Sequence, residues 1–145
     1  MLTQAAFDVG DCSRINRPVD QLLAAMTATA ALLGCAVRQR IADEFQPHGA
    51  TCVLILAESH LVVSTWPEYQ YASIDLCTCR ADVDPVTSID PILRALGGTL
   101  VHAVEVPRFD PRPKAAPSTA PRTELSHRSR PLAGPRRRDR RPALS

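Results

Sequence analysis

The sequence is almost free of lysine, and its basic residues are distributed unevenly along the chain. Of the 17 basic residues only Lys114 is a lysine. Residues 1–106 hold 6 arginines against 12 acidic residues, whereas residues 107–145 hold 11 basic against 3 acidic residues. The two parts therefore carry net charges of −6 and +8, which sum to the overall +2. This division predicts an acidic folded domain over 1–106 and a basic tail over 107–145.

Long hydrophobic runs are absent too. The longest uncharged stretch, residues 21–37, is shorter than the ~20 apolar residues that a bilayer requires, and it contains a glutamine and two threonines. No basic segment precedes an apolar run at the N-terminus, so we expect neither a membrane span nor a signal peptide. The five cysteines are an odd number without a secretion signal, which favours reduced thiols in a cytoplasmic protein over a disulfide framework.

The tail, residues 107–145, has almost no large apolar residues and holds 8 of the 13 prolines. It shows no hydrophobic periodicity, so we expect it to be disordered. Its arginine cluster could contact nucleic acid or another anionic surface, although a solvated tail without a specific partner is the favoured interpretation. The cluster comprises Arg136, Arg137, Arg138, Arg140 and Arg141.

The apolar pattern of residues 1–106 predicts the element order β-α-β-β-β-β-α-β. Apolar residues recur at helical spacing between Pro18 and Gly34, which predicts the first helix. The second helix begins at Asp84-Pro85 or at Asp90-Pro91, because Pro91 conflicts with an unbroken helix from Pro85. The expected strands cover residues 5–9, 35–41, 52–57, 61–65, 71–79 and 99–106.

These elements predict an α+β fold with a mainly antiparallel sheet, because the middle strands are joined by short links. Two helices cover only one face of such a sheet, so its other face needs a partner. Residues 71–79 alternate, and one of their two faces is too polar for a core and too rich in cysteine for a solvent face.

The most informative segment runs from Ala57 to Cys79 and reads AESHLVVSTWPEYQYASIDLCTC. It resembles the core motif of the prokaryotic S-adenosylmethionine decarboxylase proenzymes, a pyruvoyl-dependent family whose motif is close to ESHxxxHTWPExxxAxxDxxTC. Phe45-Gln46-Pro47 and Asp82-Val83-Asp84-Pro85 are similar to flanking segments of that family, so the resemblance spans about residues 4–106. ESH, TWPE and TC occur together in register, which makes the likeness specific.

Such an enzyme must stabilise the carbanion that remains when CO₂ leaves, and this requires a carbonyl cofactor. The only lysine lies in the tail and no pyridoxal phosphate site is evident, so the carbonyl would come from the chain itself. The resemblance implies that the Ser59 hydroxyl attacks the Glu58 carbonyl and that the resulting ester eliminates. Ser59 then becomes a pyruvoyl group that forms a Schiff base with S-adenosylmethionine. The products would be a β chain of residues 1–58 and an α chain of residues 59–145. Judged alone, Ser59 would be a turn hydroxyl.

The resemblance also assigns roles to four further residues. Cys79 would return a proton to the substrate carbon, Phe45 would stack on adenine, and Glu68 would bind the ribose hydroxyls. Thr51 replaces a serine beside the cleavage site and keeps its hydroxyl. Without the resemblance, Cys79 and Phe45 would be ordinary core residues and Glu68 a solvated acid.

Cys77 has no role in the family and is interpreted as structural. No metal site is expected, because a C-x-C pair on one strand beside His60 lacks a second pair of ligands.

One position departs from the family pattern. The residue before TWPE is normally a histidine, the base that drives elimination of the ester, and here it is Ser64. A serine hydroxyl is a poor base at neutral pH. Processing therefore either follows another route, is slow, or does not occur.

Three interpretations stay open. The leading one is a self-processing S-adenosylmethionine decarboxylase that serves spermidine synthesis. A second is a pyruvoyl decarboxylase of another amino acid such as arginine or ornithine, and a third is a silent homologue that only binds or assembles. The family pairs two processed units sheet to sheet in an α/β/β/α sandwich, so the resemblance implies at least a homodimer.

Overall fold

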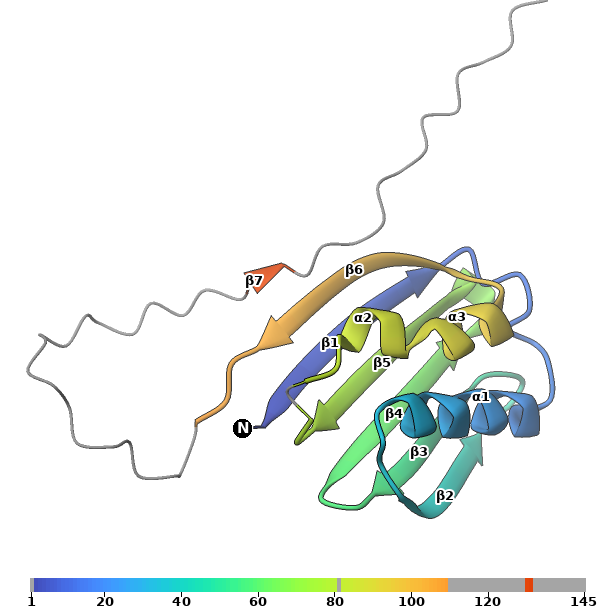
Figure 1. The fold of residues 1–145 in the computed structure, drawn as a ribbon. Coiled ribbons are helices and arrows are strands. Elements are labelled where there is room, and N and C mark those ends of the chain that lie inside the picture. The colour runs from blue at the N-terminus through green and yellow to red at the C-terminus, as the bar shows by residue number, and fades with distance from the viewer. Residues whose placement is uncertain (1, 81, 110–129, 132–145) are drawn as a thin grey trace, which may run out of the picture.

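One antiparallel sheet organises the computed structural model, which describes residues 2–80, 82–109 and 130–131. The strand order is β2-β3-β4-β5-β1-β6-β7, and every neighbouring pair is antiparallel (Figure 1). The expected α+β fold is confirmed, and the element order differs from the expected one in that the second helix is divided in two and a short strand β7 pairs at the edge. The strands are β1 (Thr3–Gly10), β2 (Val37–Glu44), β3 (Ala50–Leu56), β4 (Ser59–Trp66), β5 (Tyr71–Thr78), β6 (Thr99–Val106) and β7 (Arg130–Pro131).

The helices begin where the sequence signals predict, and both candidate starts of the second helix are used. α1 spans Val19–Leu32, α2 spans Pro85–Ser88 and α3 spans Asp90–Leu96, with a single 3₁₀ turn at Pro67–Tyr69. The Asp84 carboxylate caps α2 by accepting hydrogen bonds from two backbone N–H groups, at 3.0 and 3.4 Å. Pro91 cannot donate to a preceding turn, so a separate helix starts there.

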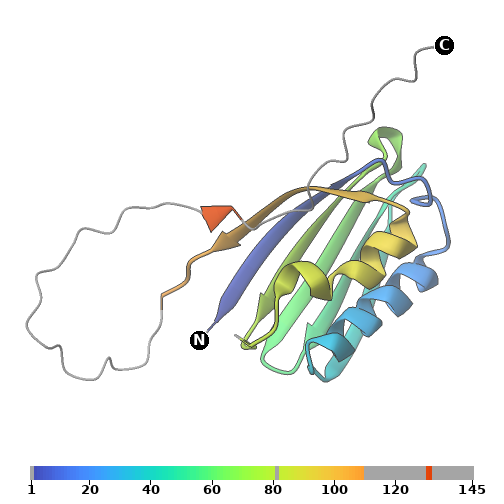
Figure 2. The ribbon, with the colours of Figure 1, turned by 45° about the horizontal axis from the view of Figure 1, so that its top comes forward.

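All three helices lie on one face of the sheet (Figure 2). Strand side chains that point toward them are buried, and on β5 these are Ala72, Ile74, Leu76 and Thr78, as the alternation predicts. α1 contributes Leu22, Met26 and Ala30 to the same core. Burial of each large apolar side chain stabilises the fold by about 1.5–3 kcal/mol, so this layer contributes most of the stability.

The opposite face of the sheet, here called the open face, is covered by none of the helices in the described part of the chain. It carries His60, Val62, Ser64 and Trp66 of β4, which alternate with the buried residues of that strand, and their cross-strand neighbours. One row across it is polar, running through Thr51, Ser64, Ser73, Asp8 and His102. Large apolar side chains lie exposed beside this row, among them Ile41, Ile55 and Trp66. An uncovered apolar surface of this kind is typical of an interface.

Most of the tail, residues 110–129 and 132–145, lies outside the described residues. The expected disorder of the tail falls mainly on these residues. Arg130–Pro131 form the short strand β7, in which Pro131 pairs with Val104 and Arg130 with Glu105 at the outer edge of β6. No helix of the described chain is long and apolar enough to cross a membrane.

Candidate active site

The predicted cleavage bond lies in the tight turn between β3 and β4. Leu56 pairs with Ser59, so only Ala57 and Glu58 connect the two strands. Glu58 has a φ of 64°, a left-handed conformation that costs a residue with a Cβ roughly 1–2 kcal/mol. The Ser59 hydroxyl oxygen is buried and has no hydrogen-bond partner among the described residues. A buried hydroxyl without a partner among the described residues thus lies beside a residue in a strained backbone conformation.

Cys79 lies next to this turn because β5 is the neighbour of β4. The strand ends at Thr78, one residue earlier than expected, and Cys79 follows it as an exposed thiol. Its Sγ donates to the carbonyl oxygen of Glu58 at 3.4 Å. The structure thus brings together Glu58, Ser59 and Cys79, three of the residues that the sequence motif singles out.

Cys77 shares the open face with Cys79 but differs in its surroundings. It is buried, and its cross-strand neighbours are His60 and Gln4. Burial raises the pKa of the Cys77 thiol above its ordinary value, which keeps it protonated at neutral pH. This agrees with the structural role expected for Cys77.

The predicted adenosyl residues lie at the other end of the sheet. Phe45 follows β2 and is 41% exposed, while Glu68 lies in the 3₁₀ turn after β4. Glu68 Oε2 is 3.3 Å from His48 Nε2, which links that turn to the loop of Phe45. The six residue steps from Ala50 to Leu56 along β3 correspond to about 20 Å. Within one chain, Phe45 and Glu68 are therefore far from Ser59 and Cys79.

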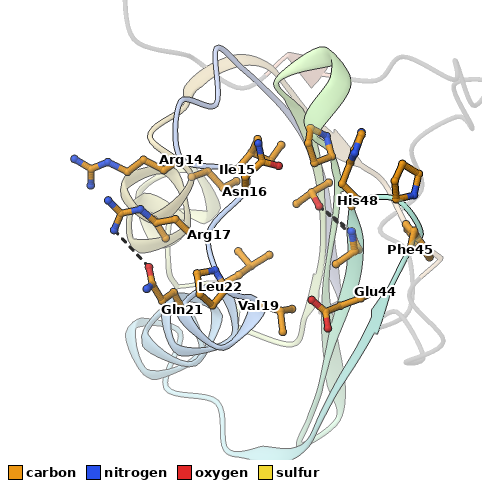
Figure 3. Close-up of a pocket in the computed structure, with 18 of the residues that line it drawn as sticks. Arg14, Ile15, Asn16, Arg17, Val19, Gln21, Leu22, Glu44, Phe45 and His48 are labelled. Carbon is orange, nitrogen blue, oxygen red and sulfur yellow. Dashed lines mark hydrogen bonds between the residues drawn. The ribbon is translucent and has the colours of Figure 1, made fainter.

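A pocket of about 280 Å³ opens beside Phe45, between the loop of residues 45–49 and the start of α1 (Figure 3). Ile15, Val19 and Leu22 lie on one side of it, with Phe45 and His48 across from them. Gly49 makes this loop possible, because its φ is 99° and a Cβ there would lie 2.9 Å from the Thr65 carbonyl oxygen. Of the predicted substrate residues, Phe45 alone lines the pocket.

Ser64 and Thr51 are cross-strand neighbours on the open face. Their hydroxyl oxygens are 2.8 Å apart in a hydrogen bond. Thr51 does not lie beside the cleavage turn of its own chain, as the sequence led us to expect, because five residue steps of β3 separate it from Leu56 at that turn. Ser64 is five residues from Ser59 on one strand, so the two side chains point to opposite faces and lie about 16 Å apart. A group at position 64 cannot reach Ser59 of its own chain.

Sequence reasoning missed two features of the open face and its edge. His48 contacts Glu68, and Asp8 accepts a hydrogen bond from the Tyr71 hydroxyl while its other oxygen lies 3.3 Å from His102 Nδ1. Asp8, Tyr71 and His102 are far apart in the sequence, and only the pairing of β1 with both β5 and β6 brings them together. No local motif signals such a cluster.

Comparison with known proteins decides the family. The sequence profile of the family described as S-adenosylmethionine decarboxylase matches residues 3–109, well over half of the chain. The chain belongs to the S-adenosylmethionine decarboxylase family. The chain has the same fold as the adenosylmethionine decarboxylase from Aquifex aeolicus VF5 in its crystal structure. Its match covers 81% of this chain and 98% of the Aquifex chain, with a TM-score of 0.67 and 24% identity.

Curated relatives agree with this placement among S-adenosylmethionine decarboxylases. An S-adenosylmethionine decarboxylase proenzyme of Thermotoga maritima is 49% identical over 61 residues, which cover 42% of this chain and 47% of the relative. The matched segment thus spans about half the length of that relative. A proenzyme of the same name from Thermosipho melanesiensis is 36% identical over 96 residues, covering 66% of this chain and 74% of the relative.

Proposed function

We propose that this protein is a self-processing, pyruvoyl-dependent S-adenosylmethionine decarboxylase whose product serves spermidine synthesis. The observation that carries the proposal is the contact of the Cys79 thiol with the Glu58 carbonyl, next to the buried, unpaired hydroxyl of Ser59. A buried hydroxyl, a residue in a strained backbone conformation and a thiol thus meet at one turn. Family membership supplies the reaction class for which this arrangement is suited.

Self-cleavage would begin with the Ser59 hydroxyl. Attack on the Glu58 carbonyl forms an ester between the two residues as their peptide C–N bond breaks. The left-handed Glu58 favours this step, because breaking the peptide bond releases the strain of the turn. Cys79 Sγ already hydrogen-bonds the oxygen on which negative charge develops. Elimination of the ester, with loss of the Ser59 α-proton, then separates residues 1–58, which end in the Glu58 carboxylate, from residues 59–145. The dehydroalanine left at position 59 takes up water and releases ammonia, which leaves the pyruvoyl group.

In turnover the pyruvoyl group at Ser59 would supply the electron sink that the protein side chains lack. The chain's own contribution would be the proton of Cys79, whose thiol lies 3.4 Å from the Glu58 carbonyl oxygen and so next to the residue that becomes the pyruvoyl group. Cys77 does not compete as a donor, because it is buried and its thiol pKa is raised.

Substrate recognition would use Phe45, Thr51 and Glu68. Phe45 is exposed enough to stack on adenine, and Glu68 presents a carboxylate to the ribose hydroxyls, with His48 orienting it. Only a few bonds separate the α-carbon of S-adenosylmethionine from its ribose, too few to span the length of β3. The adenosyl residues that complete a site would therefore come from a second copy, packed open face to open face in the homodimer.

Intact-mass spectrometry followed by a substrate assay tests the proposal. On long incubation the wild-type chain should slowly yield two fragments divided at Glu58/Ser59, with the larger blocked to Edman degradation. Labelled CO₂ should be released from S-adenosylmethionine and not from arginine or ornithine. Ser59→Ala should stay a single chain, and Cys79→Ala should lose turnover more than cleavage. Release of CO₂ from arginine or ornithine instead would assign the pyruvoyl chemistry to another substrate.

A silent homologue is the second candidate, and Ser64 favours it. The hydroxyl of Ser64 is not basic and is bonded to Thr51. A single chain after long incubation, without a hydroxylamine-sensitive ester, would select this candidate.

The five free thiols fit a reducing compartment, and we place the protein in the cytoplasm.

A further inference from the structure

The connection between α1 and β2, residues 33–36, contacts the cleavage turn. The backbone N–H of Ala57 donates to the carbonyl oxygen of Ala36 at 2.8 Å. α1 ends just before this connection, and Gly34, with a φ of 65°, lets the chain reverse direction there. The position of the Glu58 carbonyl is therefore fixed relative to this connection and not by the β3–β4 hairpin alone.

The same connection contacts the segment that carries Cys79. Thr78 is 1% exposed, and its Oγ1 lies 3.9 Å from Cys35 Sγ. Thr78 Oγ1 also accepts the backbone N–H of Arg80 at 3.1 Å. This bond closes a small ring around Cys79, which would otherwise follow the end of β5 freely.

Arg80, which follows Cys79 in the sequence, also lies beside the α1–β2 connection. Its guanidinium lies so close to Gly34 that an added Cβ would be 3.6 Å from it, and it pairs with Asp82 at 3.3 Å. Both neighbours of Cys79 in the sequence thus lie beside the α1–β2 connection.

We propose that Cys35 and Thr78 are positioning residues, which hold the Cys79 thiol and the Glu58 carbonyl in contact by fixing both to the α1–β2 connection. The inference rests on the proposed function for its catalytic meaning, because that function makes Cys79 the proton donor. The expected effect on the contact does not depend on that function: loss of the Thr78 hydroxyl should release Cys79 from the cleavage turn.

A chain that cannot process provides the first test. In a Ser59→Ala background, the rate of Cys79 alkylation by iodoacetamide is measured by peptide mass mapping, which separates it from the other cysteines. Thr78→Val removes the hydroxyl at nearly constant volume and should speed alkylation about 2- to 12-fold, the change in population that the net strength of one hydrogen bond allows. Thr78→Ser keeps the hydroxyl and should react at the parent rate. An unchanged rate in Thr78→Val, or equal rates in both variants, would overturn the inference.

The processed enzyme provides the second test. Thr78→Val should lower kcat by a similar factor with KM unchanged, and Thr78→Ser should restore it. If Thr78→Val does not fold, Cys35→Ala removes the other partner of the same contact, at a half-buried residue where the substitution is easier to accommodate. An unchanged rate of Cys79 alkylation in Cys35→Ala would refute the role of Cys35. Absence of decarboxylation in the wild-type chain would refute the proposed function, whereas normal decarboxylation with unchanged alkylation would refute the positioning role alone.

Discussion

Ser64 illustrates how a single side chain can limit a reaction that the rest of the site supports. Its hydroxyl bonds to Thr51 on the open face, on the side of β4 opposite to Ser59. Because the two positions are about 16 Å apart within one chain, a base at position 64 would have to act at the cleavage turn of a second copy. The ester at Ser59 can form without that base, but its elimination requires removal of a weakly acidic α-proton.

Ser64→His should therefore accelerate formation of the pyruvoyl fragment. An imidazole with a pKa near 6.5 accepts a proton at neutral pH, and a general base contributes about 10²- to 10⁴-fold. In the wild-type chain, processing should be slow or stalled, and hydroxylamine should cleave the accumulated ester. Fragment formation followed by mass spectrometry measures both, with Ser64→Ala as the control that stays slow. Fast, complete processing of the wild-type chain would contradict this prediction and make His60→Ala the next variant.

Tyr71 offers a test of the cluster that the sequence did not reveal. Its hydrogen bond to Asp8 raises the pKa of Tyr71 to about 12. The unfolded chain loses this proton near pH 10, so the contribution to stability is complete below pH 10 and is lost as the pH rises from about 10 to 12. Urea unfolding from pH 9 to 12 should show a loss for the wild-type chain that Tyr71→Phe lacks. Parallel curves for both proteins would mean that the bond to Asp8 does not stabilise the fold.

At the scale of elements, the sequence predicts most of what the structure contains. The strands and α1 follow from apolar periodicity and from Pro and Gly at their ends, because these signals are local. The sequence left open whether the second helix begins after Asp84 or at Asp90. The structure has a helix at each position, because Asp84 caps α2 and Pro91 prevents α2 from continuing into α3. Ser59 and Cys79 were singled out through the motif, whereas the contact of Cys79 with Glu58 depends on the pairing of β4 with β5.

Glu58→Gly tests the strain stored in the β3–β4 turn. Glycine adopts a positive φ without the steric cost that a Cβ imposes, so the variant should raise the free energy of unfolding by about 1 kcal/mol. The measurement is urea denaturation in a Ser59→Ala background, where cleavage cannot intervene, and Glu58→Ala serves as the control that keeps the Cβ. A glycine variant no more stable than the alanine variant would show that the turn stores no such strain. In chains with Ser59 intact, the relaxed turn should also process more slowly.

At the scale of the whole molecule, the two halves of the proposed site lie at opposite ends of one sheet. Ser59 and Cys79 are at the end where β3 turns into β4, whereas Phe45 and Glu68 are at the end where β4 leaves the sheet. The open face joins the two ends, and no helix of the described residues covers it (Figure 2). A two-fold dimer that packs these faces with the strands reversed would place the adenosyl end of each copy over the cleavage end of the other.

Mixing two inactive variants tests this arrangement. Cys79→Ala removes the proton donor and Glu68→Gln weakens ribose binding, so each homodimer should have little activity. If sites are shared between copies, a heterodimer of the two variants contains one site with both changes and one without any. Random mixing makes about half of the dimers heterodimers, so roughly a quarter of wild-type activity should return after co-refolding or co-expression. Homodimers of the double variant provide the control. Sedimentation at micromolar concentration should find the dimer, and a monomer that decarboxylates S-adenosylmethionine, or a mixture no more active than its parents, would show that each chain builds its site alone.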